Sequence, residues 1–164
     1  MSSFLIRITL LVLLFTATGC PYESEVPIDE PSVAVPTALP GVWKGVSDSG
    51  IVATVTQTDA YSFHISYAED SAATNNYSAY LSVLRNVSLL NLHPLQPVSG
   101  LNGPYAFYKF DLSADGKQLT LTPVTDNIRE KFTSSRRQKA FFRKYVHTSF
   151  FYTIDEEFRY EKTE

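Results

Sequence analysis

The sequence predicts a mainly β fold, either an antiparallel barrel or a β-sandwich, with one amphipathic helix near the C-terminus. Short runs of alternating apolar and polar residues follow one another from residue 40 onward. No helical pattern separates neighbouring runs, and this excludes a parallel sheet with crossover helices. Tyrosine (10) and phenylalanine (11) are abundant, whereas tryptophan and methionine occur once each. Aromatic residues of this kind favour half-buried strands.

The strands are expected in order along the chain. A first strand covers 42–47, and Ser49-Gly50 offers a turn into the next strand, 51–56. The clearest alternation lies in 61–68, where every second residue is aromatic or aliphatic. Further strands are expected at 77–83, 87–92, 105–112 and 117–124. The last two flank Asp115-Gly116, the strongest hairpin signal in the chain.

The C-terminal part contains the expected helix. Ser135 and Gln138 have the spacing of a capping box, in which two side chains satisfy free backbone amides at the helix start. Apolar residues then recur on one helical face, namely Phe141, Phe142, Tyr145 and Val146. The segments 148–154 and 157–160 are expected to supply a closing strand or a bulged pair of short strands.

The N-terminal segment predicts export. Residues 4–15 are almost wholly apolar but too short to span a bilayer as a helix. The following run, Ala17-Thr18-Gly19-Cys20, resembles the lipobox of bacterial lipoproteins. The resemblance implies that residues 1–19 form a signal peptide and that Cys20, the single cysteine, receives a diacylglycerol and an N-acyl chain. The alternative is an ordinary secretory signal with Cys20 as a bystander.

The same resemblance implies a membrane-anchored location in the bacterial cell envelope. Pro21 follows the cysteine in place of an aspartate, which favours the outer membrane if the cell is Gram-negative. Residues 20–39 are rich in proline and acidic residues and predict a semi-stiff tether between lipid and domain. Alternatively, part of this segment packs on the domain through Val33, Val35 and Leu39. Residues 40–164 are expected to form a single β-rich domain.

Residues at the start of this domain resemble the lipocalin and calycin families of small barrels. These barrels often open with Gly-x-Trp on the first strand, and Gly41-Val42-Trp43 stands at that place. The resemblance implies that Trp43 plugs one end of a lipocalin-like barrel. It also implies an arginine stacked on the tryptophan, for which Arg85, Arg143 and Arg159 are all candidates.

Composition and motifs exclude several functions. The net charge of −3 argues against nucleic acid as a partner. The sequence has no G-x-S-x-G elbow and no phosphate-binding loop, and its three histidines, His64, His93 and His147, do not have metal-ligand spacing. The acidic run 155–157 is interpreted as solvated rather than catalytic. We therefore expect no enzymatic activity, no metal and no cofactor.

Two features remain as candidate sites. A pocket for a small lipophilic or amphiphilic ligand is expected from aromatic residues if the barrel is open, namely Trp43, Tyr61, Phe63, Tyr67, Tyr77, Tyr105 and Phe107. Contact with an anionic surface is expected from the basic residues Arg136, Arg137, Lys139, Arg143 and Lys144. The leading hypothesis is a lipid-anchored binding module. The alternative, with a filled barrel, is an envelope protein that binds or inhibits another protein through the loop 93–104.

Overall fold

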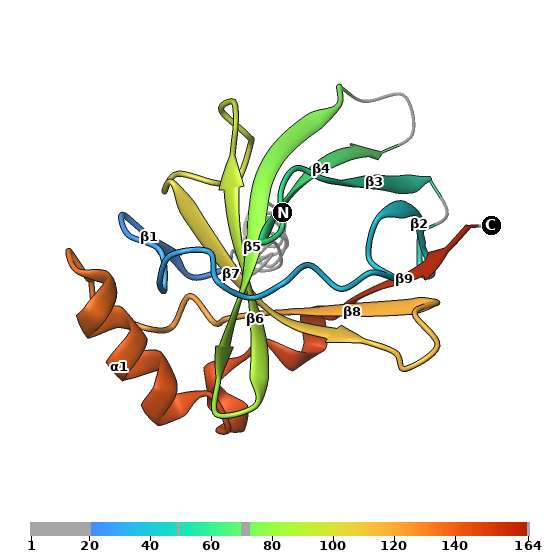
Figure 1. The fold of residues 1–164 in the computed structure, drawn as a ribbon. Coiled ribbons are helices and arrows are strands. Elements are labelled where there is room, and N and C mark those ends of the chain that lie inside the picture. The colour runs from blue at the N-terminus through green and yellow to red at the C-terminus, as the bar shows by residue number, and fades with distance from the viewer. Residues whose placement is uncertain (1–20, 49, 70–72, 164) are drawn as a thin grey trace, which may run out of the picture.

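The computed structural model describes residues 21–48, 50–69 and 73–163, and it shows a closed antiparallel β-barrel with a helix on its outer wall (Figure 1). The elements in chain order are β1 (Glu23–Ser24), β2 (Gly41–Gly45), β3 (Ile51–Gln57), β4 (Ser62–Glu69), β5 (Asn75–Leu84), β6 (Val87–Pro94), β7 (Tyr105–Leu112), β8 (Gln118–Pro123), α1 (Ser135–Tyr145) and β9 (Phe158–Lys162). In the described part of the chain, each strand from β2 to β9 pairs with the next, and β9 returns to β2. The predicted lipocalin-like barrel is confirmed, and the sandwich alternative is excluded.

The pleat of the strands sorts side chains between the barrel interior and the outer wall. On β5, Ala79 and Leu81 point inward, whereas Tyr80 and Ser82 point outward, because successive residues of a strand face opposite sides. The inward residues form the barrel core, a buried cluster with Val35, Leu39, Trp43, Ala53, Val55, Phe63, Tyr77, Ala79, Leu81, Leu90, Leu92, Phe110, Leu119 and Tyr160. Most of these residues alternate along their strands as the sequence predicts.

The segment before β2 closes one end of the barrel. We name residues 33–39 the strap; its Val35 and Leu39 are buried in the barrel core. Figure 1 shows the chain before β2 crossing the barrel on its way to that strand. The strap also contacts the turn between β7 and β8 closely, because a Cβ atom added to Gly116 would lie 2.4 Å from the Cβ of Ala38. Gly116 has φ of +70°, a conformation that glycine adopts without strain.

The tether predicted for residues 20–39 is corrected by the structure, and so is the domain boundary at residue 40. Tyr22 is 2% exposed and Ile28 is fully buried. β1 pairs with the first residues of β7, and Pro21 forms a β-bridge with Thr125. Prolines and acids predicted a spacer, but the apolar residues between them make tertiary contacts that outweigh this tendency. The domain therefore includes every described residue from 21 onward.

A second buried cluster lies outside the barrel, between its wall and α1. We name it the outer core, and its members are Tyr22, Ile28, Leu84, Leu89, Phe107, Val124, Phe142, Val146 and Phe151. The ring of Phe142 contacts Tyr22, Phe107 and Phe151, with centroid distances of 5.9, 5.3 and 5.0 Å. The outer core joins the N-terminal segment, the barrel wall and the C-terminal segment into one unit.

The helix is confirmed, but its predicted capping box is wrong. Ser134 occupies the N-cap, and no side chain caps the helix there. Gln138 is instead fully buried, and its Oε1 accepts a hydrogen bond of 2.5 Å from the Ser24 hydroxyl. The predicted strand at 148–154 is also wrong, because Ser149–Phe151 and Ile154–Glu156 form 3₁₀ turns. One of these turns places Phe151 in the outer core, and β9 then closes the barrel.

Candidate binding groove

The seven residues predicted to line an internal pocket divide between three environments. Trp43, Phe63 and Tyr77 are buried in the barrel core, and Tyr67 packs against it. Tyr105 and Phe107 instead face outward to the outer core, and Tyr61 is 46% exposed in the turn between β3 and β4. The prediction is therefore wrong for these last three residues. Counting aromatic residues does not reveal which face of its strand each one occupies.

Three tyrosines lie near one another in the barrel interior. Burial raises the pKa of Tyr160, and the neighbouring Tyr67 and Tyr77 raise it further. Burial also raises the pKa values of Tyr67 and Tyr77 themselves. All three phenols are therefore neutral at ordinary pH, and the barrel interior is an apolar environment.

Trp43 occupies the closed end of the barrel, as the resemblance implies. It is fully buried, and its indole Nε1–H donates a hydrogen bond of 2.9 Å to the carbonyl of Leu39 in the strap. The cation over its ring is Lys162, with Nζ 5.6 Å from the ring centroid, rather than Arg85, Arg143 or Arg159. The same Nζ donates to the carbonyl of Ala38 at 2.6 Å. A lysine on the last strand thus holds the strap over the tryptophan.

A cavity of about 800 Å³ lies at the barrel rim, where inward-facing residues such as Leu81 and outward-facing residues such as Lys109 both line it, and we name it the rim groove. Its apolar side comes from the strap, β5, the start of β6 and the end of α1, through Val33, Pro36, Leu81, Val87 and Val146. Its polar side comes from β7, β8 and the C-terminal segment, through Lys109, Asp111, Thr122, His147 and Glu157. None of the seven predicted pocket residues lines this groove.

The charged groups of the rim groove are paired. Lys109 Nζ lies 2.7 Å from Asp111 Oδ2. Glu157 Oε2 accepts from Arg159 at 3.0 Å, and Glu157 Oε1 lies 3.4 Å from the Thr122 hydroxyl that donates to it. The Tyr152 phenol donates to the carbonyl of Val146 at 2.7 Å. Burial, and secondarily the charge of Asp111, raises the pKa of Tyr152. The groove therefore presents fixed polar groups on one side and apolar carbon on the other.

Sequence reasoning missed these groove residues because they come from separate strands. Lys109 and Asp111 alternate with inward-facing neighbours on β7, and Glu157 belongs to the acidic run interpreted as solvated. No local spacing relates them to the strap. Among the described residues, no group of three or more His, Cys, Asp or Glu side chains is placed to hold a metal ion.

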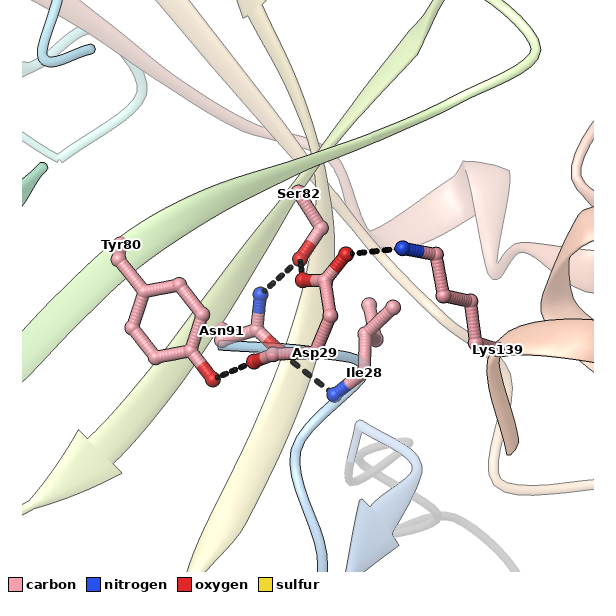
Figure 2. Close-up of polar contacts among 6 residues, drawn as sticks. All are labelled: Ile28, Asp29, Tyr80, Ser82, Asn91 and Lys139. Carbon is pink, nitrogen blue, oxygen red and sulfur yellow. Dashed lines mark hydrogen bonds and ion pairs between the residues drawn. The ribbon is translucent and has the colours of Figure 1, made fainter. Parts of the chain in front are cut away.

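A buried polar network fixes the N-terminal segment to the wall and to α1 (Figure 2). Asn91 is fully buried; its Oδ1 accepts from the Ile28 amide at 3.0 Å, and its Nδ2 donates to Ser82 at 2.8 Å. The Ser82 hydroxyl donates to one carboxylate oxygen of Asp29, and Lys139 binds the other at 2.6 Å.

Lys139 differs from the other basic residues predicted to contact an anionic surface. Its ammonium group is engaged with Asp29, whereas the other four basic residues predicted to contact an anionic surface are exposed: Arg136, Arg137, Arg143 and Lys144. Tyr80 donates to the Asp29 carbonyl at 2.6 Å, and burial raises the pKa of this phenol. Lys139 therefore ties the helix to the N-terminal segment.

The loop 95–104 lies at the end of the barrel opposite the strap. Its Val98 and Leu101 pack against the barrel core. The backbone amides of Asn102 and Gly103 donate to Glu23 Oε2 at 3.0 and 2.6 Å, which joins the loop to β1. The loop thus covers the barrel end, and its first residue, Leu95, is 54% exposed.

Comparison with family models, with curated proteins and with solved structures finds no match to this chain. In the part of the chain that the structure describes, no helix has the length and apolar character needed to cross a bilayer. Cys20, the predicted lipidation site, and the predicted signal peptide lie outside the described residues.

Proposed function

We propose that this chain is a lipid-anchored protein of the bacterial cell envelope, and that its domain is a non-enzymatic binding module for a small amphiphilic ligand. The observation that carries the binding function is the rim groove. Its volume of about 800 Å³ lies in the range of small-molecule sites, which are commonly about 300–1,000 Å³. The lipobox-like run ending at Cys20 supports the anchor.

The two sides of the rim groove suit an amphiphile. Val33, Pro36 and Val87 offer apolar contact for a hydrocarbon or aromatic part. Across the groove, Lys109 and Asp111 offer a cation and an anion to a polar head group. The Lys109 side chain is 36% exposed and that of Asp111 is 52% exposed, so a ligand can exchange contacts with this pair at modest cost. The groove replaces the barrel interior as the proposed ligand site.

The carboxylates and the buried phenol of the groove favour binding over catalysis. A general base or nucleophile must reach a reacting atom with a free lone pair. In the groove, Asp111 and Glu157 are each held by a cation, and the Tyr152 phenol is committed to a backbone carbonyl. These contacts orient the groove but leave its carboxylates poorly disposed for proton transfer.

The barrel core favours a second candidate function. Its aromatic residues pack on one another and on Val98 and Leu101 of the loop 95–104. A barrel of this kind, with the loop held at one end, suits an interaction or inhibitor protein whose partner is another envelope protein. Leu95, exposed by 54%, is the apolar residue of the loop best placed for such a contact.

Native mass spectrometry separates these two functions. The mature chain, isolated from a bacterial envelope, is expected to carry an adduct of a few hundred daltons that is lost on denaturation. Ser149→Trp fills the rim groove and is expected to abolish the adduct, whereas Ser66→Trp, on the outer face of β4, is expected to retain it. A bare mass for the parent chain, or an adduct equally present in both variants, contradicts ligand binding in the groove.

The anchor is tested by the intact mass of the membrane-extracted protein. The expected mass is that of residues 20–164 plus a diacylglycerol and an acyl chain on Cys20, and Cys20→Ser is expected to lack this addition. An unmodified mature mass contradicts the proposed anchor but not the proposed groove.

A further inference from the structure

The proposed anchor leaves the domain no spacer. Pro21 forms a β-bridge with Thr125, and the amide of Tyr22 donates to the carbonyl of Val124 at 2.7 Å. Pro21, to which Cys20 is covalently joined, is therefore fixed to the barrel wall. Acyl chains on Cys20 would therefore hold the part of the barrel wall around Pro21 and Thr125 against the lipid head groups.

A line of partly exposed aromatic rings runs beside this attachment point. Phe132, Phe141, Tyr145 and Phe150 form what we name the aromatic row. Successive ring centroids are 5.3, 4.7 and 5.9 Å apart. Phe150, at 68%, is the most exposed of the eight large hydrophobic residues on the described surface. The row thus presents apolar edges to whatever faces α1.

Both ends of the aromatic row are joined to the residues that follow Cys20. At one end, the Tyr22 phenol donates to the carbonyl of Glu130 at 2.7 Å, and Lys131 Nζ lies 5.6 Å from the Tyr22 ring. At the other end, the amide of Thr125, the bridge partner of Pro21, donates to the carbonyl of Phe151 at 3.0 Å. The row and the attachment point therefore belong to the same side of the molecule.

Basic residues border the aromatic row. Lys144 Nζ lies 5.0 Å from the centroid of Tyr145, and Arg137 is exposed one helical turn before Phe141. The helix Ser135–Tyr145 contains five basic residues and no acidic residue. In the neighbouring segment 126–131, Asp126 and Glu130 are balanced by Arg129 and Lys131. This side of the molecule is thus cationic although the chain as a whole is acidic.

Two arginines of the helix lie where a positive charge does not stabilise it. The N-terminal end of a helix carries a partial positive charge, so cations in the first turn are unfavourable there. Arg136 and Arg137 lie in that first turn, with no acidic residue beside them. Arg143 and Lys144 lie in the last turn, where the dipole favours cations. The first pair therefore does not stabilise the helix through its dipole and remains free to meet an anionic partner.

The geometry points to a membrane-docking face made of the aromatic row with Lys131, Arg136, Arg137, Arg143 and Lys144, whose occupant is the anionic lipid surface in which the Cys20 chains are inserted. Aromatic residues and flanking cations are the features that hold a helix in the interfacial plane of a bilayer. This inference rests on the proposed lipid anchor, because the anchor places the face within reach of lipid. It adds an orientation: α1 faces the membrane.

Vesicle binding tests the membrane-docking face in a chain that carries no acyl chains on residue 20. The mature chain, residues 20–164 with Cys20→Ser, is mixed with vesicles of equal parts phosphatidylglycerol and phosphatidylcholine, and the bound fraction is measured by sedimentation. Arg137→Glu with Lys144→Glu is expected to weaken binding about 20-fold or more. Phe150→Ser is expected to weaken it about fivefold. All three positions are exposed, so the variants are expected to fold.

Matched controls separate this face from net charge and general hydrophobicity. Lys44→Glu with Lys117→Glu makes the same change in charge at exposed residues of β2 and of the β7–β8 turn, and Tyr61→Ser removes an exposed aromatic ring between β3 and β4. These controls are expected to bind within about twofold of the parent. Equal weakening in controls and face variants, or no binding by the parent, overturns the inference.

The lipidated chain gives a second readout. Acylated Cys20 has no free thiol, so Phe150→Cys provides a single site for a fluorophore, with Tyr61→Cys as its control. Quenching by lipids labelled in the head group and acyl chain is expected at residue 150 but not at residue 61. Equal quenching contradicts the orientation. If the native chain carries no lipid but the Cys20→Ser chain still binds vesicles, the docking face is supported and only the proposed anchor is contradicted.

Discussion

The barrel core is assembled mainly from strands that follow one another in the chain, with one long-range closure between β2 and β9, whereas the outer core is assembled from segments far apart in the chain. Each barrel strand from β2 to β8 pairs with its successor. In contrast, the contact between Tyr22 and Glu130 spans 108 residues, and that between Ser24 and Gln138 spans 114. Closing such long loops costs more conformational entropy than joining adjacent hairpins.

The comparison teaches how the anchor is coupled to the fold. The outer core contains Tyr22, two residues after Cys20, and it supports α1 through Phe142. A pull on the proposed anchor is therefore transmitted to the outer core before it reaches the barrel. Because the outer core has no hairpins of its own and joins only separate segments, we expect it to open first, while the barrel hairpins keep their hydrogen bonds.

Truncation of one phenylalanine in each core is expected to give the largest and most distinct effects. Phe142 and Phe63 are both almost fully buried, so each change to alanine is expected to cost about 3–5 kcal/mol. Phe142→Ala is expected to remove hydrogen-exchange protection from α1 and β1 and to spare β3–β5. Phe63→Ala is expected to lower protection throughout. The same pattern of exchange in both variants would show that the two cores unfold as one unit.

Removal of the Asp29 carboxylate is expected to have a smaller effect, confined to the outer core. Asp29→Ala breaks the ion pair with Lys139 and leaves the Ser82 hydroxyl without its acceptor. We expect a loss of about 2 kcal/mol in urea unfolding. Glu30→Ala, at the exposed neighbouring residue, is expected to change stability by less than about 0.5 kcal/mol. Equal losses at the two positions would contradict a structural role for the polar network.

The smallest expected effect is a change in pH dependence at Tyr22. Burial, and secondarily Glu130, raises the pKa of Tyr22 from 10.0 to about 12. The folded chain thus holds this proton more tightly than the unfolded chain does. The resulting stability is fully present below about pH 10 and is lost as the pH rises toward about 12.

Tyr22→Phe removes this contribution together with the hydrogen bond to Glu130, which is worth about 1 kcal/mol. The variant is therefore expected to melt earlier than the parent at neutral pH, and its melting temperature is expected to fall less steeply between pH 10 and 12. Thermal melts across this range measure both quantities. Parallel curves for variant and parent would contradict burial of the Tyr22 phenol in the outer core.

Strand positions were largely predictable because alternation is a local property. The predicted strand at 105–112 has the observed bounds, and the Asp115-Gly116 turn lies in the observed hairpin. The candidate sites were less predictable. Tyr105 and Phe107 lie on the same strand as Phe110 but face the other side, and the rim groove combines residues of the strap with residues of β7 and the C-terminal segment. Such a combination leaves no pattern within a short window of sequence.

The sequence by itself determined the barrel strands and the amphipathic helix, because each depends on the spacing of neighbouring side chains. Burial of Trp43 was implied by the resemblance of Gly41-Val42-Trp43 to the start of a lipocalin barrel. Only the tertiary structure decided that residues 21–39 pack on the barrel, that Lys139 binds Asp29, and that the large cavity lies at the barrel rim. The physical reason is that these features depend on contacts between residues far apart in the chain, such as Asp29 and Lys139, which are 110 residues apart. Proline and acidic residues favour an extended chain locally, but burial of Tyr22, Ile28 and Leu39 stabilises the packed segment.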